Sequence, residues 1–244
     1  MKSVGDEGAL AGVRVLVAAG STRAYIDSVR YVSNASTGQT GAAIVEECLS
    51  RGALVTFVHG PCCAQPNVPE GKSDALTTIE IETVGDALEI LREELRGGNQ
   101  QVCIHPMAVL DYLPERLNGG KIPSDKTSIT LKLVRGPKII EQVKQIAPAI
   151  ILVGFKLESN CSDKSLVKQA EKLMGRSGAE FVVANDQARI KDGKHPALIC
   201  RKTDKGIETI ETEGKREIAR VLCDQIQDLL MKKREGMPRT VWST

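Results

Sequence analysis

Short apolar runs alternate with helix-length amphipathic segments through most of the chain, and this alternation limits the fold more than any other feature. Residues 13–19 (VRVLVAA) and 149–155 (AIILVGF) are mostly apolar, as strands of a parallel sheet buried on both faces are. Strands separated by helices of about 10–15 residues form βαβ units. The pattern therefore predicts an α/β protein with a Rossmann-like, doubly wound, mainly parallel sheet. Strands are expected at 13–19, 54–59, 77–82, 102–105, 149–155 and 180–184, and helices at 38–49, 86–95, 165–176 and 215–233.

An excursion at about residues 113–135 interrupts this alternation. Residues 117–126 (LNGGKIPSDK) are polar with two glycines and a proline, which predicts a loop. Residues 129–134 (ITLKLV) alternate apolar and polar side chains, as a half-exposed antiparallel strand does. Its apolar face, made by Ile129, Leu131 and Leu133, is expected to pair with a second chain. A loop is also expected at 60–75, and a late hairpin at 197–201 and 206–210.

The size and charge of the chain bound its class. Its 244 residues predict a single domain over 1–234 with a C-terminal tail at 235–244. Lys and Arg number 33 and Asp and Glu 31, so the basic excess that a sequence-independent nucleic-acid binder needs is missing. No apolar run approaches the roughly 18 residues of a membrane span, and the start has no signal-peptide pattern, so a cytoplasmic protein is expected. Seven scattered cysteines without a C-x-x-C pair predict neither a disulfide scaffold nor a zinc site.

The loop after the first strand is where a ligand is expected, because open α/β sheets bind ligands at the carboxyl ends of their strands. It reads GSTRAYIDSVRYVSNASTGQTG from Gly20 to Gly41. Its small residues let backbone N–H groups approach a phosphate, and the helix that follows favours negative charge at its start. It is not a dinucleotide fingerprint, since no glycine follows Gly20 until Gly38 and no acidic residue ends the second strand at His59. Phosphate binding is predicted, and nicotinamide chemistry is not.

The string G-S-T-R-x-x-I-D-x-V-R-x-x-S-N-x-S-T-G-x-x-G resembles the signature loop of phosphopantothenoylcysteine synthetase, or phosphopantothenate–cysteine ligase, of coenzyme A biosynthesis. Five further motifs follow in that family's order. They are MAVLDY at 107–112, KI at 121–122, GPKI at 136–139, VGFKLE at 153–158 and VAND at 183–186.

The chain departs from the family's pattern at three places. STGQTG at 36–41 stands for the usual SSGKMG, Met107 stands for an alanine, and KIPSDK at 121–126 stands for a K-x-K-K flap. These departures leave the choice of nucleotide open. With no decarboxylase half before this segment, the stand-alone form of the synthetase is expected.

The resemblance implies a homodimeric ligase that joins 4′-phosphopantothenate to L-cysteine. The substrate carboxylate would attack the α-phosphate of CTP or ATP, supplied with Mg²⁺, and release pyrophosphate. The cysteine amine would then displace the nucleoside monophosphate. Both steps build negative charge on oxygen, so the protein's task is positioning and charge stabilisation.

The resemblance also implies roles for individual residues. Asn34 would donate to the developing oxyanion, and Lys121 would close over the triphosphate as a lid residue. Arg30 would bind substrate in its own or the neighbouring subunit's site. The implied substrate-binding residues are Arg30, Asn34, Met107, Ala108 and Asp111. The implied nucleotide-binding residues are Gly20, Ser36, Gly38, Gly41, Asp111, Lys121, Pro137, Lys138, Ile139, Ile140, Phe155, Lys172, Arg176 and Asn185, of which Lys172 and Arg176 share one helical face.

Each of these residues also has a purely structural interpretation. Asn34 would satisfy its own loop backbone, and Asp111 would cap a helix. Lys121 would be a solvated loop lysine, and Phe155 would pack in the core. Two other functions stay open beside the ligase: a non-catalytic nucleotide-binding module on the same fold, and a Rossmann oxidoreductase.

Overall fold

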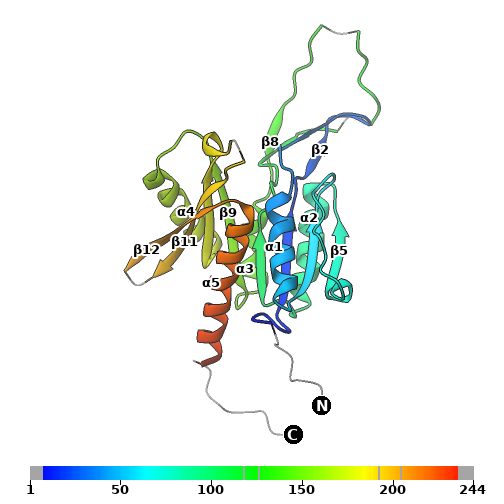
Figure 1. The fold of residues 1–244 in the computed structure, drawn as a ribbon. Coiled ribbons are helices and arrows are strands. Elements are labelled where there is room, and N and C mark those ends of the chain that lie inside the picture. The colour runs from blue at the N-terminus through cyan, green and yellow to red at the C-terminus, as the bar shows by residue number, and fades with distance from the viewer. Residues whose placement is uncertain (1–7, 118, 126, 192, 204, 236–244) are drawn as a thin grey trace.

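The computed structural model of the chain describes residues 8–117, 119–125, 127–191, 193–203 and 205–235. The main sheet is built from β1 (Arg14–Ala19), β4 (Leu54–His59), β5 (Leu76–Glu80), β6 (Val102–His105), β9 (Ile151–Glu158), β10 (Phe181–Asp186), β11 (Pro196–Thr203) and β12 (Gly206–Glu213). Its eight strands follow the order β12-β11-β10-β9-β6-β1-β4-β5 (Figure 1). The strands from β5 to β10 in this order are parallel, and β11 and β12 form an antiparallel hairpin at one edge. The predicted α/β fold with a mainly parallel sheet is confirmed.

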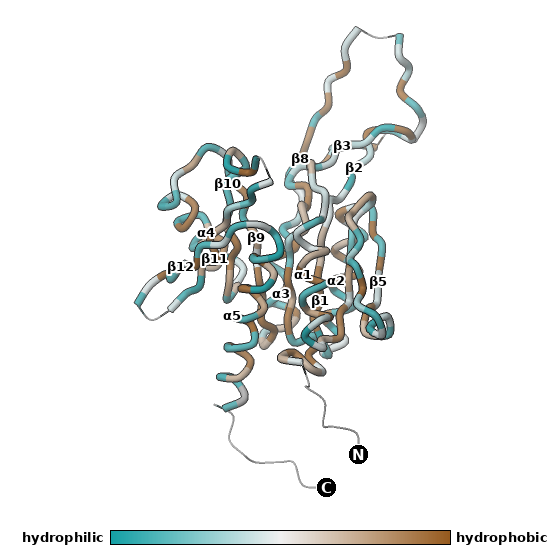
Figure 2. The backbone as a smooth tube through the Cα atoms, viewed as in Figure 1, coloured by the Kyte–Doolittle hydropathy of each residue, from teal (hydrophilic) through white to brown (hydrophobic). Residues whose placement is uncertain are grey.

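Helices cover both faces of the sheet. They are α1 (Gln39–Ser50) and α5 (Lys215–Glu235) on one face, and α2 (Val84–Arg96), α3 (Ile139–Ile146) and α4 (Asp163–Ser177) on the other. Successive side chains of a strand point to opposite faces. Accordingly, Val15 and Val17 of β1 pack with α1 and α5, whereas Leu16 and Ala18 pack with α2, α3 and α4. Figure 2 shows hydrophobic residues along the central strands, between these two helical layers.

The helix ends follow from local side-chain chemistry. Thr83 accepts a hydrogen bond from the backbone N–H of Asp86, and the Asp86 carboxylate accepts from the backbone N–H of Thr83, which closes a capping box at the start of α2. The Ser162 hydroxyl accepts from the Ser165 N–H at the start of α4. Gly178 ends α4 in a left-handed conformation with φ of 73°.

Two short hairpins lie outside the main sheet, and the sequence predicted neither of them in full. β2 (Arg23–Tyr25) pairs with β3 (Tyr31–Ser33) inside the loop after β1, and β7 (Tyr112–Pro114) pairs with β8 (Leu133–Arg135). The strand predicted at 129–134 is wrong for residues 129–132. These residues lie outside the ladder of β7 and β8 and have little core to cover them, and Ile129 is 54% exposed. An unpaired strand has no partner for its backbone hydrogen bonds.

Other differences concern element limits. α3 was not predicted, because it is short and follows the proline at 137. β9 continues to Glu158, so Phe155 lies inside the strand and not at its end. Of the predicted tail, Glu235 is the last residue of α5 and the rest lies outside the described residues, as does position 126 of the predicted flap motif. Within the described part of the chain, no helix combines the length and apolar character needed to cross a bilayer.

Candidate active site

The loops after β1 and β6 lie side by side at the carboxyl edge of the sheet. The Ala108 N–H donates to the Gly20 carbonyl at 2.8 Å. The buried hydroxyl of Thr22 accepts from the Leu110 N–H at 3.1 Å. These bonds join two segments that are almost ninety residues apart in sequence, at the edge where ligands of open α/β sheets bind.

Asn34 connects the two loops with its side chain. Its Nδ2 donates to the carbonyl oxygens of Ala108 at 3.2 Å and of Val109 at 3.1 Å. Both partners only accept hydrogen bonds, so the orientation of the amide is fixed by chemistry. The structure thus brings Asn34 and Ala108 together, two of the residues predicted from sequence. With both amide hydrogens on carbonyls, donation to a reacting oxygen requires one of them to be redirected.

Asp111 follows directly in the second loop and faces solvent. Its carboxylate accepts a hydrogen bond from the Lys138 ammonium group, and its carbonyl accepts from the Gly136 N–H at 2.9 Å. The alternative helix-cap role of Asp111 is excluded, because the residue precedes β7. An exposed ion pair of this kind contributes little to stability, so both groups can exchange partners with a ligand.

Four of the predicted ligand-binding residues have side chains that pack inside the protein. Met107 and Ile139 are 7% and 3% exposed in the core between the sheet and α2, α3 and α4. Ile140 packs against the same core, and Phe155 packs against the core on the other face. Contact with a ligand through these residues is therefore limited to backbone atoms or the partly exposed edges of Ile140 and Phe155.

The glycines of the first loop are required by close packing. A Cβ atom on Gly38, whose φ is 70°, would lie 2.1 Å from the Cys63 sulfur. A Cβ atom on Gly41 would lie 2.2 Å from that of Ala19, so only glycine lets the start of α1 approach β1 this closely. The Gly38 N–H is 3.4 Å from the Ser36 hydroxyl, which accepts its hydrogen bond. The loop from Gly20 to Gly41, which is predicted to bind phosphate, therefore leads into an α1 whose first turn lies at the carboxyl edge of the sheet.

A second cluster joins the start of α1 to the end of β10. Asn185 Nδ2 lies 3.3 Å from His195 Nε2, and the Lys215 ammonium group donates to the Gln39 side-chain oxygen. Burial lowers the pKa of His195, and the nearby Lys215 lowers it further against the opposing effect of Glu213. The neutral ring therefore accepts the hydrogen bond from Asn185. Sequence reasoning gave no role to Gln39, His195 or Lys215, and the latter two stand in none of its motifs.

A buried carboxylate connects the first loop to the flap, defined as residues 115–132 between β7 and β8. Asp27 is 0% exposed and accepts hydrogen bonds from the backbone N–H groups of Val29, Arg30 and Ile122 and from the Arg30 guanidinium group. Burial alone would raise the pKa of Asp27, but these donors outweigh it and lower the pKa to about 2. Asp27 stands in the resembling motif, yet sequence gave it no role because its burial depends on a contact 95 residues away.

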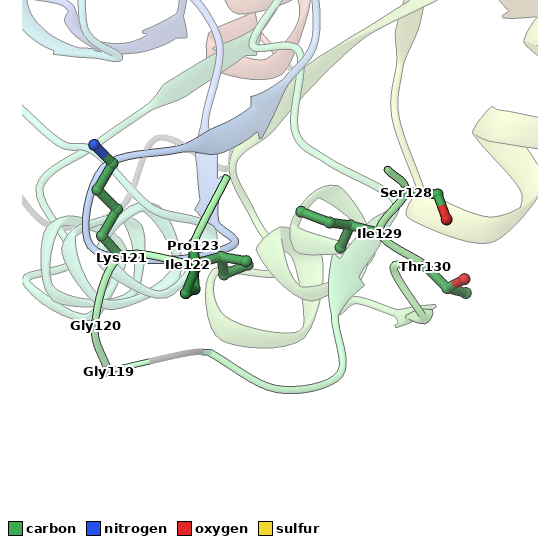
Figure 3. A pocket seen from close by; sticks show the side chains of 8 residues that line it. All are labelled: Gly119, Gly120, Lys121, Ile122, Pro123, Ser128, Ile129 and Thr130. Atoms are coloured by element: carbon green, nitrogen blue, oxygen red, sulfur yellow. The ribbon is translucent and has the colours of Figure 1, made fainter. Parts of the chain in front are cut away.

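The flap, which contains Lys121, extends away from the body of the protein (Figure 1). A cavity of about 530 Å³ lies between its two arms, lined in part by Ile122 and Ile129. Figure 3 shows these two side chains pointing toward one another, whereas Lys121 extends away from Ile129. Arg30 Nη1 donates to the Ile122 carbonyl at 3.2 Å, so the structure brings Arg30 next to the residue that follows Lys121.

The two cationic residues of α4 that were predicted to bind nucleotide make no hydrogen bond or ion pair with the described residues of the site above. Lys172 and Arg176 are both exposed, and Arg176 Nε lies 3.6 Å from the Glu141 carboxylate of α3. Both side chains therefore lie on a solvated face of α4. Among the described residues, no group of three or more His, Cys, Asp or Glu side chains is arranged to hold a metal ion.

Comparison with known proteins places the chain beside one family. Residues 10–230 match the family of the DNA/pantothenate metabolism flavoprotein C-terminal domain. The coenzyme A biosynthesis bifunctional protein CoaBC of Thermococcus kodakarensis is 39% identical over 222 residues, which cover 91% of this chain and 52% of that protein. The chain thus spans about half the length of such relatives.

Two solved structures agree in fold and in extent. The crystal structure of the DNA/pantothenate metabolism flavoprotein from Streptococcus pneumoniae has a TM-score of 0.80 and 32% identity, and the match covers 89% of this chain and 100% of that one. The C-terminal domain of a coenzyme A biosynthesis bifunctional protein CoaBC has a TM-score of 0.73 and 30% identity, with 92% and 99% covered.

Proposed function

The chain belongs to the family of the DNA/pantothenate metabolism flavoprotein C-terminal domain, and from this membership we propose that it is a phosphopantothenate–cysteine ligase that consumes a nucleoside triphosphate. Its relatives are named for coenzyme A biosynthesis, and the chain corresponds to about half of each. The proposed reaction joins 4′-phosphopantothenate and L-cysteine into 4′-phospho-N-pantothenoylcysteine.

The structural observation that carries this proposal is the position of Asn34. Its side chain donates hydrogen bonds to the carbonyls of Ala108 and Val109, beside the Asp111–Lys138 ion pair. A neutral amide, a carboxylate and an ammonium group then share one edge of the sheet. The substrate carboxylate attacks the α-phosphate, an acyl-nucleotidylate forms and pyrophosphate leaves. The amine of cysteine next attacks the acyl carbon, and the nucleoside monophosphate departs with the former carboxylate oxygen.

We propose the following roles for this chain's residues. Asn34 redirects one amide hydrogen from its carbonyl partner to the oxygen that gains charge at the acyl carbon, where a donor lowers the barrier. Lys121 supplies a positive charge from the flap, and Lys138 a second one from the start of α3. The loop from Gly20 to Gly41 and the cluster around Asn185 hold the nucleotide. Mg²⁺ is commonly held by one or two carboxylates together with phosphates, and we assign Asp111 to share it.

We further propose that the protein is a homodimer built through the two small hairpins and the flap. Large apolar side chains there are exposed, and a second copy would cover them. They are Val29, Tyr31, Tyr112, Leu117, Ile129, Leu133 and Val134. Light scattering at micromolar concentrations should give twice the chain mass, and a monomeric mass would contradict the proposal.

The activity is tested by following pyrophosphate in the presence of phosphopantothenate, cysteine, Mg²⁺ and either CTP or ATP. Release with one of the two nucleotides supports the ligase and identifies the nucleotide. No release with either would leave the non-catalytic nucleotide-binding module in its place. The oxidoreductase alternative predicts binding of NADPH, which a fluorescence titration measures.

A further inference from the structure

We propose that Asp27 is a positioning residue that holds Lys121 of the flap in place for catalysis, an inference that rests on the proposed function. Asp27 stands in the turn between β2 and β3, close to the tip of a hairpin that extends to the flap in Figure 1. Its carboxylate is fully buried although the flap residues around its contact are exposed. A buried charge in such a place needs several donors, and the structure supplies four.

The two carboxylate oxygens of Asp27 have different partners. Oδ1 accepts from the N–H groups of Val29 at 2.8 Å and Arg30 at 2.7 Å, which closes the hairpin turn. Oδ2 accepts from the Ile122 N–H at 3.1 Å and the Arg30 guanidinium at 2.6 Å. Arg30 in turn donates to the Ile122 carbonyl. Both backbone polar groups of Ile122 are therefore held, and Lys121 is the residue directly before it.

Among the described residues, no comparable contact restrains the chain on the other side of Lys121. Gly119 and Gly120 precede it, and a Cβ atom added to either glycine would have no heavy atom within 4 Å. Glycine in open space adopts many backbone conformations, and fixing them costs conformational entropy. The hydrogen bonds of Asp27 and Arg30 to Ile122, here called the tie, restrain the chain directly after Lys121 before any ligand arrives. Charge-assisted bonds to an ionised carboxylate are strong enough to keep the tie closed.

The substitution Asp27→Asn tests the role of Oδ2 separately from the role of Oδ1. Asparagine keeps an oxygen that accepts from Val29 and Arg30, so the hairpin turn is retained. Its amide nitrogen replaces Oδ2 and faces two donors, so the tie to Ile122 is lost. Asp125→Asn is the matched control, because it makes the same change of charge on an exposed carboxylate of the flap. If Asp27→Asn is unfolded at the assay temperature, Asp27→Ser replaces it, since a serine hydroxyl also closes such turns.

Trypsin cleavage after Lys121, identified by mass spectrometry, measures the tie without any reference to activity. We expect cleavage roughly tenfold faster in Asp27→Asn, the effect of losing one hydrogen bond to a charged group, and unchanged in Asp125→Asn. Equal cleavage in wild type and Asp27→Asn would overturn the proposal. Should the wild-type chain release no pyrophosphate, the proposed function fails, and this comparison still decides whether Asp27 holds the flap.

Turnover then tests whether the tie acts through Lys121. Asp27→Asn should lower kcat about tenfold and leave the KM for cysteine unchanged. In a Lys121→Gln background the same substitution should cause no further loss, because residues that act through one another are not additive. A full tenfold loss in that background would show that Asp27 acts independently of Lys121, and wild-type turnover in Asp27→Asn would show that the tie is not used in catalysis. Either result overturns the positioning role.

Discussion

Replacing Asn34 separates its catalytic role from its role in the loop. The side chain makes two hydrogen bonds to backbone carbonyls, each contributing roughly 0.5–1.5 kcal/mol when buried. Because Asn34 is exposed, water can replace it at both carbonyls, and we expect Asn34→Ala to lower the free energy of unfolding by only about 1 kcal/mol. A domain of this kind is stable by about 5–15 kcal/mol, so the variant stays folded.

Asn34→Ala should reduce the turnover rate far more than it reduces the free energy of unfolding. Loss of one donor to a developing oxyanion costs on the order of 10²–10³ in rate, or about 3–4 kcal/mol of barrier. Asn34→Asp should be slower still, because its carboxylate faces two carbonyl oxygens and a polyphosphate, where like charges repel. Urea unfolding measures the stability of both variants, and pyrophosphate release measures their turnover. Turnover within twofold of wild type in Asn34→Ala, or a faster Asn34→Asp than Asn34→Ala, would refute this reasoning.

Three further predictions concern single side chains. Lys121→Gln should still bind nucleotide and should accumulate the acyl-nucleotidylate, which quenched-flow mass spectrometry detects; wild-type turnover without that species would contradict the role of Lys121. Burial lowers the pKa of His105 to about 4, below its ordinary value of 6.5, so the unfolded chain binds a proton that the folded one excludes. His105 should therefore lower the free energy of unfolding as the pH drops from about 6.5 to about 4, by up to roughly 1.4 kcal/mol per unit, and His105→Leu should remove this contribution and leave a shallower slope; an equal slope in both proteins would contradict it. At pH 8, iodoacetamide should label exposed Cys62 well before buried Cys103, whose pKa burial raises to about 12; equal labelling in a peptide map would be the opposite result.

The parts of the fold that follow from sequence are those in which burial leaves a local pattern. β1 and β9 are buried on both faces, and their continuous apolar runs predicted parallel strands correctly. The flap has no such pattern, because its apolar residues alternate but face little core, and the strand predicted from Ile129 onward forms only at Leu133–Arg135. α3 was missed since its eight residues are too few for a clear helical period.

Some contacts of the candidate site could also be predicted from sequence, and others could not. Loops that leave neighbouring parallel strands meet at one sheet edge, so the approach of Asn34 to Ala108 was predictable from the strand order of a Rossmann-like fold. The contact of Asp27 with Ile122 was not, because it joins a hairpin tip to a distant loop through a single carboxylate. The same holds for Lys215 and Gln39, which meet only because α5 packs beside α1.

The fate of the substrate's carboxylate oxygen tests the ligase proposal most directly. With 4′-phosphopantothenate labelled by ¹⁸O in its carboxylate, attack on the α-phosphate followed by attack of the cysteine amine transfers one labelled oxygen to the nucleoside monophosphate. Mass spectrometry of the products should therefore find one ¹⁸O atom in CMP or AMP and none in pyrophosphate. Unlabelled nucleoside monophosphate, or label in inorganic phosphate beside a nucleoside diphosphate, would contradict the acyl-nucleotidylate and the reaction built on it.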